Sequence, residues 1–129
     1  MGAVDDDGVT LAVPWREDLV GDPETGVLAG GVVSALLDHA CGLAVWTALD
    51  TFQPIATLDM RIDYLRAAEP GKAVLARAGV FRLTRSIAFV RGVAHDGDPE
   101  DPVAAVQAAF MLDSDAGRRA GANLKDAQP

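Results

Sequence analysis

One carboxylate interrupts the longest apolar-rich stretch of this sequence, which runs from Val27 to Leu49. Asp38 lies near the middle of that stretch, among valines, leucines and alanines. Aspartate is a mediocre helix former and is rarely buried unpaired, because a carboxylate among apolar groups is costly unless it is hydrogen-bonded or faces a cleft. Asp38 is therefore a candidate reactive carboxylate. The alternatives are that it caps a neighbouring loop or simply faces solvent.

Two adjacent glycines, Gly30 and Gly31, precede the apolar run that ends at Asp38. If a helix begins there, its N-terminus presents free N–H groups and a partial positive charge, and glycine lets a ligand approach the backbone closely. Such a site can polarise a carbonyl group and hold the oxyanion that develops from it. From Gly31 to Asp38 the rise along a helix is roughly 10–11 Å, which an extended ligand could span. An ordinary loop-to-helix junction remains the alternative.

The other potentially reactive side chains offer little further chemistry. Ser34 lies on the same helical face as Asp38, four residues earlier, and is a candidate for contacting a ligand bound there. Cys41 shares that face, but no neighbouring residue type would activate it, which favours an inert core cysteine. Two histidines and one cysteine without ligand spacing predict no metal site, and no cofactor is expected.

Charge and cysteine content restrict the expected partners and compartment. The net charge is −8, with 11 basic against 19 acidic residues, so neither nucleic acid nor an anionic membrane surface is an expected partner. The acidic N-terminus lacks the cationic start of a signal peptide, and the polar residues within residues 27–49 make that stretch too polar for a membrane span. A single cysteine excludes an intrachain disulfide and favours a reducing compartment, so a cytoplasmic location is expected.

The hydrophobic pattern predicts one helix among several strands. The segment from Val32 to about Leu49 is too long for a strand and is apolar on most sides, which indicates a buried helix. Strict alternation follows it and predicts a half-buried strand, and the turn residues beyond separate further apolar runs. The expected strands cover residues 9–13, 57–64, 73–81, 86–95 and 103–112.

A chain of 129 residues fits one domain, expected at residues 9–112 between a flexible lead-in at 1–8 and a disordered tail at 113–129. One helix cannot cover both faces of a five-stranded sheet, so the sheet should wrap around the helix and leave an edge that needs a partner. The prediction is an α+β fold, a five-stranded antiparallel sheet around one long central helix, assembled as a homodimer.

Two stretches together resemble the PaaI-type hotdog thioesterases. Residues 26–38 read Gly-Val-Leu-Ala-Gly-Gly-Val-Val-Ser-Ala-Leu-Leu-Asp, which is similar to the family's His-Gly-Gly motif followed by an apolar run and an aspartate. Residues 57–66 look like the family's first long strand. The resemblance covers about residues 26–112. It implies a hotdog fold and a hydrolase of acyl-CoA thioesters, without metal or cofactor, that forms a homodimer and leaves a homotetramer open.

The resemblance also assigns roles at matching positions. Asp38 matches the catalytic carboxylate, which acts as a general base or as a nucleophile. Gly30 matches the residue whose backbone N–H polarises the thioester carbonyl. Thr57 matches a hydroxyl position that assists water or the intermediate, while Gly31 and Ser34 are expected to contact the substrate beside these groups. In this family the Gly30-like and Asp38-like residues of one site come from different subunits.

Coenzyme A carries phosphates, which need cations. Arg82 and Arg85 flank a predicted turn and resemble the family's basic turn, so they are candidates for binding the coenzyme. Arg66 and Lys72 are further candidates. Each of these cations could instead be an ordinary solvated surface charge.

The sequence departs from the family pattern at two positions. The family's histidine is Ala29 here, and its asparagine aligns near Pro23. His39 cannot substitute, because it points about 100° away from Asp38 on a helix, and a packed structural role is favoured. These departures leave open a non-catalytic hotdog protein that binds an acyl thioester or a partner. A hotdog hydratase is disfavoured, because the histidine it needs about five residues after the aspartate is Leu43 here.

Overall fold

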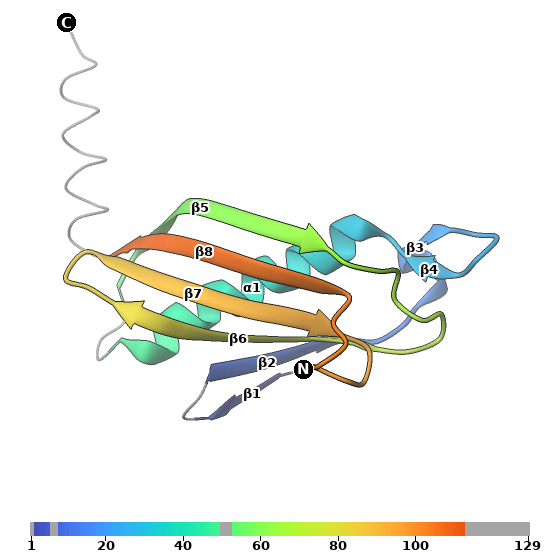
Figure 1. Ribbon diagram of the computed structural model, residues 1–129, viewed down its shortest axis with the longest axis horizontal. Helices are drawn as coiled ribbons and strands as arrows, with labels where there is room; N and C mark the ends of the chain where they lie inside the picture. The colour runs from blue at the N-terminus through green and yellow to red at the C-terminus, as the bar shows by residue number, and fades with distance from the viewer. Residues whose placement is uncertain (1, 6–7, 50–52, 113–129) are drawn as a thin grey trace, which may run out of the picture.

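The computed structural model describes residues 2–5, 8–49 and 53–112, and it shows one long helix packed across a single antiparallel sheet (Figure 1). The helix, α1, spans Gly30–Ala48. The strands of the sheet are β1 (Gly2–Asp5), β2 (Gly8–Val13), β5 (Ile55–Tyr64), β6 (Val74–Leu83), β7 (Ile87–His95) and β8 (Ala104–Leu112). Before the helix come a short 3-10 helix, Glu17–Leu19, and a two-stranded ribbon of β3 (Val20–Asp22) and β4 (Val27–Leu28).

The sheet has the order β1-β2-β6-β7-β8-β5, with every pair antiparallel. Strand β5 follows the helix in the chain, yet it pairs with β8 rather than with its successor β6, and so it forms one edge of the sheet. Register irregularities interrupt β5 and β6. Bulges of this kind increase the local twist and let a sheet curve around a helix.

The predicted α+β class and the central helix are confirmed, but the sheet has six strands rather than five. The additional strand is β1, which pairs with β2 at residues expected to form a flexible lead-in. The sequence prediction also missed the ribbon of β3 and β4, because these strands have only three and two residues and show no readable alternation. The expected tail at 113–129 lies outside the described residues.

Helix α1 packs on the sheet through small and branched apolar side chains. It lies against β2, β6 and β7 and only weakly against β8, so β5 extends beyond the part of the sheet that the helix covers. The sheet meets the helix with alternate residues that are mostly alanine and valine, which lets the two layers approach closely. The buried residues of the helix are Val33, Leu37, Ala40, Cys41, Ala44 and Val45.

Contrary to the sequence expectation, α1 is long and apolar enough to cross a membrane by length and composition alone, and it is the single such helix among the described residues. A core helix that buries a face against a sheet meets the same criteria. The buried residues of α1 pack on β2, β6 and β7.

An ion-pair cluster fastens the loop after β5 to the turn between β7 and β8. The Arg66 guanidinium donates two hydrogen bonds to the Asp96 carboxylate, at 3.0 and 2.7 Å, and contacts Asp101 through a carboxylate oxygen and the backbone carbonyl. Asp96 also accepts the backbone N–H of Glu69 at 2.8 Å, and its side chain is only 8% exposed. The hydrogen bonds from Arg66 hold the pKa of the Asp96 carboxyl far below its ordinary value.

Replacing this carboxylate by Asp96→Asn should lower the free energy of unfolding by about 2 kcal/mol at pH 7, because hydrogen bonds to charged groups are lost at a nearly buried site. The folded-state pKa of Asp96 lies below the unfolded one. Its contribution is therefore complete above about pH 4 and is lost as the pH falls below that value. Urea unfolding at fixed protein concentration should show a constant difference in unfolding free energy between wild type and variant from pH 7 to about pH 4, and a narrowing difference from there to about pH 2.

Asp18→Asn is the matched control, since Asp18 forms a 2.7 Å ion pair with Arg16 in which both side chains are well exposed. Exposed pairs contribute little, so this variant should unfold almost as the wild type does at every pH. A constant difference between Asp96→Asn and wild type from pH 7 to pH 2 would contradict the assignment.

Candidate active site

The N-terminus of α1 is open to solvent and has no side-chain cap. The N-cap residue, Ala29, provides no capping hydrogen bond, and the first turn contains no acidic residue. Gly30 and Gly31 are both exposed, and no partner for their N–H groups is found within the described part of the chain. These uncapped N–H groups, at the positive end of a 19-residue helix, can donate to a carbonyl oxygen or an oxyanion.

Contacts distant in sequence hold this helix end in place. The Tyr64 hydroxyl, at the end of β5, donates to the Gly30 carbonyl oxygen at 3.1 Å, and the Ala29 N–H donates to the Leu19 carbonyl at 2.9 Å. The indole N–H of Trp15 binds the Gly26 carbonyl at 2.9 Å. The sequence gives no indication that Tyr64 contacts this helix end, and its side chain is 54% exposed.

Asp38 is exposed in the middle of α1, and its carboxylate forms no hydrogen bond or ion pair with another described residue. The proposal that it caps a neighbouring loop therefore finds no support in the described contacts. Ser34 lies one turn earlier, partly exposed, with its hydroxyl donating to the Gly31 carbonyl at 3.2 Å. The structure thus places Gly30, Gly31, Ser34 and Asp38 along the same helix, with no described partner at the Asp38 carboxylate.

The spacing of these groups restricts how they can act. Helix α1 is continuous from Gly30 to Ala48, so Gly30 and Asp38 of one chain are separated by a rise of about 12 Å. Groups that act on one reacting carbonyl must lie within about 3–3.5 Å of their target atoms. The N–H of Gly30 and the carboxylate of Asp38 from the same chain therefore cannot both contact a single carbonyl.

The start of β5 and the turn between β6 and β7 lie at the opposite end of the molecule from the start of α1 (Figure 1), and Thr57, Arg82 and Arg85 belong to these segments. Thr57 is exposed near the start of β5, and the rest of that strand, about 23 Å, separates it from Tyr64, which contacts Gly30. Arg82 and Arg85 are exposed at the turn between β6 and β7, with no partner recorded among the described residues. The structure does not bring these three residues to Gly30 within one chain.

Two of the four candidate cations for binding phosphates are engaged elsewhere. Arg66 is held in the cluster with Asp96, and the Lys72 ammonium lies 2.7 Å from the Glu69 carboxylate. These partners raise the pKa of each cation. Of these four candidates, Arg82 and Arg85 at the turn between β6 and β7 are the two without an ion-pair partner among the described residues.

Two side chains next to Asp38 have different environments. Cys41 is buried against the sheet, and burial together with the nearby Asp38 charge raises the pKa of its thiol to about 12. The predicted core position of Cys41 is confirmed. His39 is exposed rather than packed, which corrects the expectation for it, and its Nδ1 lies 3.2 Å from the Ala35 carbonyl oxygen. No group of three potential metal ligands occurs among the described residues.

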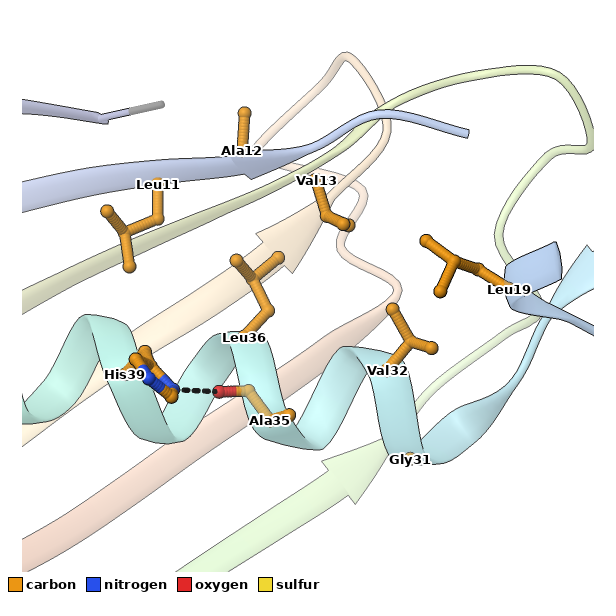
Figure 2. Close-up of a pocket in the computed structure, with 9 residues that line it drawn as sticks. All are labelled: Leu11, Ala12, Val13, Leu19, Gly31, Val32, Ala35, Leu36 and His39. Atoms are coloured by element: carbon orange, nitrogen blue, oxygen red, sulfur yellow. Dashed lines mark hydrogen bonds between the residues drawn. The ribbon is translucent and has the colours of Figure 1, made fainter. Parts of the chain in front are cut away.

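A cavity of about 480 Å³ lies between β2 and the flank of α1 that carries His39 (Figure 2). We refer to it as the β2–α1 cavity. Figure 2 shows β2 above the helix, with Leu36 and Val32 pointing up toward the strand and Leu19 beside them. Its lining is apolar except for the imidazole of His39. The residues are Leu11, Ala12, Val13, Leu19, Gly31, Val32, Ala35, Leu36 and His39.

Residues 25–103 match the family model of the thioesterase superfamily. Among curated proteins, the chain is 34% identical over 85 residues to a protein of Halobacterium salinarum whose name gives esterase as a provisional activity. That alignment covers 64% of this chain, and the chain spans only about half of that relative, 55% of its length. The matched region contains the glycine pair, Asp38 and strands β5, β6 and β7.

Solved structures with the same architecture include three from different bacteria. A Pseudomonas aeruginosa protein is 42% identical, with a TM-score of 0.78 over 84% of this chain and 81% of that one. A mutant of the phenylacetic acid degradation protein PaaI from Thermus thermophilus is 28% identical, with a TM-score of 0.71 over 84% and 88%. A Bacillus halodurans protein solved with CoA is 21% identical, with a TM-score of 0.74 over 87% and 72%, and shows the likeness of fold.

The family match covers more than half of the chain, and the helix-on-sheet architecture agrees with the solved relatives. The resemblance inferred from the glycine pair and the aspartate is therefore confirmed at the level of the family. This chain belongs to the thioesterase superfamily and has the hotdog fold of the PaaI-related thioesterases.

Proposed function

We propose that this protein hydrolyses acyl-CoA thioesters, with Asp38 as general base and the N–H of Gly30 as oxyanion donor. The observation that carries the proposal is the pairing, on one helix of a thioesterase-superfamily chain, of an uncapped exposed N-terminus with an exposed carboxylate that has no described partner. The CoA bound to the Bacillus halodurans protein, which shares the fold, supports a CoA ester as the substrate class.

Hydrolysis requires two proton transfers, the formation of a carbon–oxygen bond and the cleavage of the carbon–sulfur bond. The thioester oxygen accepts a hydrogen bond from the N–H of Gly30, which polarises the carbonyl group. The Asp38 carboxylate takes a proton from a water molecule as the water oxygen adds to the carbonyl carbon. Collapse of the tetrahedral intermediate breaks the carbon–sulfur bond, and the proton returns from Asp38 to the CoA sulfur. The products are a free acid and CoA.

Because one chain cannot bring both groups to the same carbonyl, the proposed site contains Asp38 of one subunit and the partner subunit's Gly30. Strand β5 offers the means. It is a ten-residue edge strand, and an unpaired edge readily accepts another strand. Two β5 strands that pair antiparallel about a two-fold axis would continue the sheet and set the two α1 helices antiparallel. Each Asp38 would then approach the first turn of the other helix.

The same arrangement gives the free cations a role. The turn between β6 and β7, which carries Arg82 and Arg85, lies at the opposite end of each chain from the start of α1, so antiparallel pairing would bring it toward the partner subunit's helix N-terminus. There they could bind the phosphates of the coenzyme whose thioester occupies that site. Thr57, near the start of β5, would move toward the same end. Nothing in this arrangement requires a metal or a cofactor.

Ala29 favours a second candidate function, a protein that binds an acyl thioester without hydrolysing it. At this position the family has a histidine, whereas the alanine at the helix N-cap offers the substrate only its backbone. Such a protein would use the same N–H groups and the same free cations. It would lack a side chain beside Gly30 to place the substrate or the water.

Release of free thiol from short, long and aromatic acyl-CoAs distinguishes the two functions. The wild-type protein should release CoA from at least one class at a rate that scales with enzyme concentration. Calorimetry with the same esters provides the second readout. Tight binding of an ester that is not hydrolysed over many hours would favour the binding protein and reject the hydrolase.

A further inference from the structure

We propose that the β2–α1 cavity holds the acyl group of the substrate, and that His39 selects acyl groups whose far end carries a hydroxyl. This inference rests on the proposed function, because it specifies which thioester the site would take. It concerns the flank of α1 that faces β2, whereas the proposed chemistry uses the N-terminus and the Asp38 flank.

The cavity begins at the helix end that would bind the thioester carbonyl. Gly31 belongs both to the cavity lining and to the uncapped first turn of α1. A carbonyl oxygen held by the N–H groups of this turn therefore leaves its acyl substituent at the entrance of the cavity. At about 480 Å³ the cavity lies within the range typical of small-molecule sites, which are mostly apolar with few polar groups.

The walls of the cavity suit an extended apolar chain. From α1, Val32 and Leu36 point toward the strand, and β2 contributes Leu11 (Figure 2). Burying methylene groups against such walls is favourable, at about fourfold in affinity for each one. Along the helix, the cavity extends from Gly31 to His39, a rise of about 12 Å, which accommodates a medium-length acyl chain.

His39 supplies the one polar side chain of the lining, at the opposite end of the cavity from Gly31 (Figure 2). Its Nδ1 lies 3.2 Å from the Ala35 carbonyl oxygen, which can only accept a hydrogen bond. Nδ1 therefore donates in that contact, which leaves Nε2 available for a hydrogen bond with a ligand. Nε2 has no recorded partner among the described residues. A hydroxyl at the far end of an acyl chain would satisfy it.

Two variants test the two parts of the proposal. Ala35 lies halfway between Gly31 and His39 and is exposed, so Ala35→Trp should block the cavity without disturbing the core. Ala3→Trp, on the exposed edge strand β1, adds the same side chain outside the cavity. The readout is kcat/KM for octanoyl-CoA and for the shortest acyl-CoA that the wild type hydrolyses. Ala35→Trp should reduce the first by about 50-fold, equivalent to about three excluded methylenes, and leave the second within about twofold.

The role of His39 is tested with a matched pair of esters, octanoyl-CoA and 8-hydroxyoctanoyl-CoA. The wild type should prefer the hydroxylated ester. His39→Leu, which keeps an apolar side chain of similar reach, should reduce that preference about fivefold, the contribution of one hydrogen bond. His39→Gln retains an acceptor and should preserve it. An unchanged preference in His39→Leu overturns the assignment to His39.

These outcomes distinguish a failure of the cavity proposal from a failure of the catalytic proposal. If the wild type hydrolyses esters but Ala35→Trp retains full activity toward octanoyl-CoA, the cavity is not the acyl site and the hydrolase stands. If the wild type hydrolyses no ester, the catalytic proposal fails, and calorimetry then decides on the cavity. Octanoyl-CoA binding that Ala35→Trp weakens while CoA binding stays the same supports the cavity, and equal weakening of both, or no weakening, rejects it.

Discussion

Asp38→Asn should reduce kcat for the best acyl-CoA ester by about a thousandfold or more, because the amide cannot accept a proton from water as the carboxylate does. The KM for the same ester should change little, since the two side chains have nearly the same shape. The measurement is thiol release by wild type and variant at equal protein concentration across the same substrate range.

The fold should survive this substitution. Asp38 is exposed and makes no hydrogen bond or ion pair with a described residue, so the variant should unfold within about 0.5 kcal/mol of the wild type. Circular dichroism and thermal unfolding provide that control. Retention of more than a tenth of the wild-type kcat by a folded Asp38→Asn protein would exclude this carboxylate as the base or nucleophile.

The second large effect is expected at Gly30. Gly30→Pro removes the backbone N–H that we assign to the oxyanion and should lower kcat by about 100-fold to 1,000-fold, the usual consequence of losing one oxyanion donor. The substitution fits the local backbone, because Gly30 is the first residue of α1, where proline is well tolerated. The preceding Ala29 has φ −61° and ψ 140°, the extended conformation that a residue before proline prefers.

Gly30→Ala provides the matched control, since it keeps the N–H group. Its Cβ would lie 3.8 Å from Cε1 of Tyr64, an ordinary van der Waals contact. This variant should therefore keep kcat within a few fold of the wild type. Equal loss of activity in Gly30→Ala and Gly30→Pro would assign the effect to crowding near Tyr64 instead of to the missing donor.

The helix and the long strands could be predicted from the sequence because their patterns are local. The apolar segment that begins after Gly31 is too long for a strand, and the alternation of β5 identifies it without any tertiary information. Strand β1 could not be predicted, because four residues carry too little pattern and its existence depends on pairing with β2. The ribbon of β3 and β4 could not be predicted for the same reason, because its strands have only three and two residues.

The part of the candidate site that lies on a single helix could be predicted from the sequence. The spacing of Gly30, Gly31, Ser34 and Asp38 is written in the chain, and the structure places all four on α1 as expected. Tyr64 could not be connected with Gly30, because 34 residues separate them and the bond depends on where β5 ends. Each of these features is a local spacing or a long-range contact, and only the first kind is visible in a sequence.

Long-range packing also determines whether the remaining charged and polar candidates are exposed or engaged by other residues. Arg66 was a reasonable cation for a phosphate until the fold brought Asp96 against it from 30 residues away. His39 was expected to be packed because it lies in an apolar helix, yet the helix exposes it beside a cavity that β2 closes from the other side. Neither outcome could be derived from residue type or helical spacing.

Mixing two inactive variants tests the central claim, a site shared between two subunits. Asp38→Asn and Gly30→Pro proteins are combined in equal amounts, allowed to exchange subunits, and assayed for thiol release. A site that contains Asp38 of one subunit and the partner subunit's Gly30 predicts recovery of about one quarter of the wild-type rate, because half of the dimers are mixed and each has one intact site. If each site lies within one chain, every site in the mixture carries a defect, and an exchanged mixture that stays as inactive as its components would contradict the account.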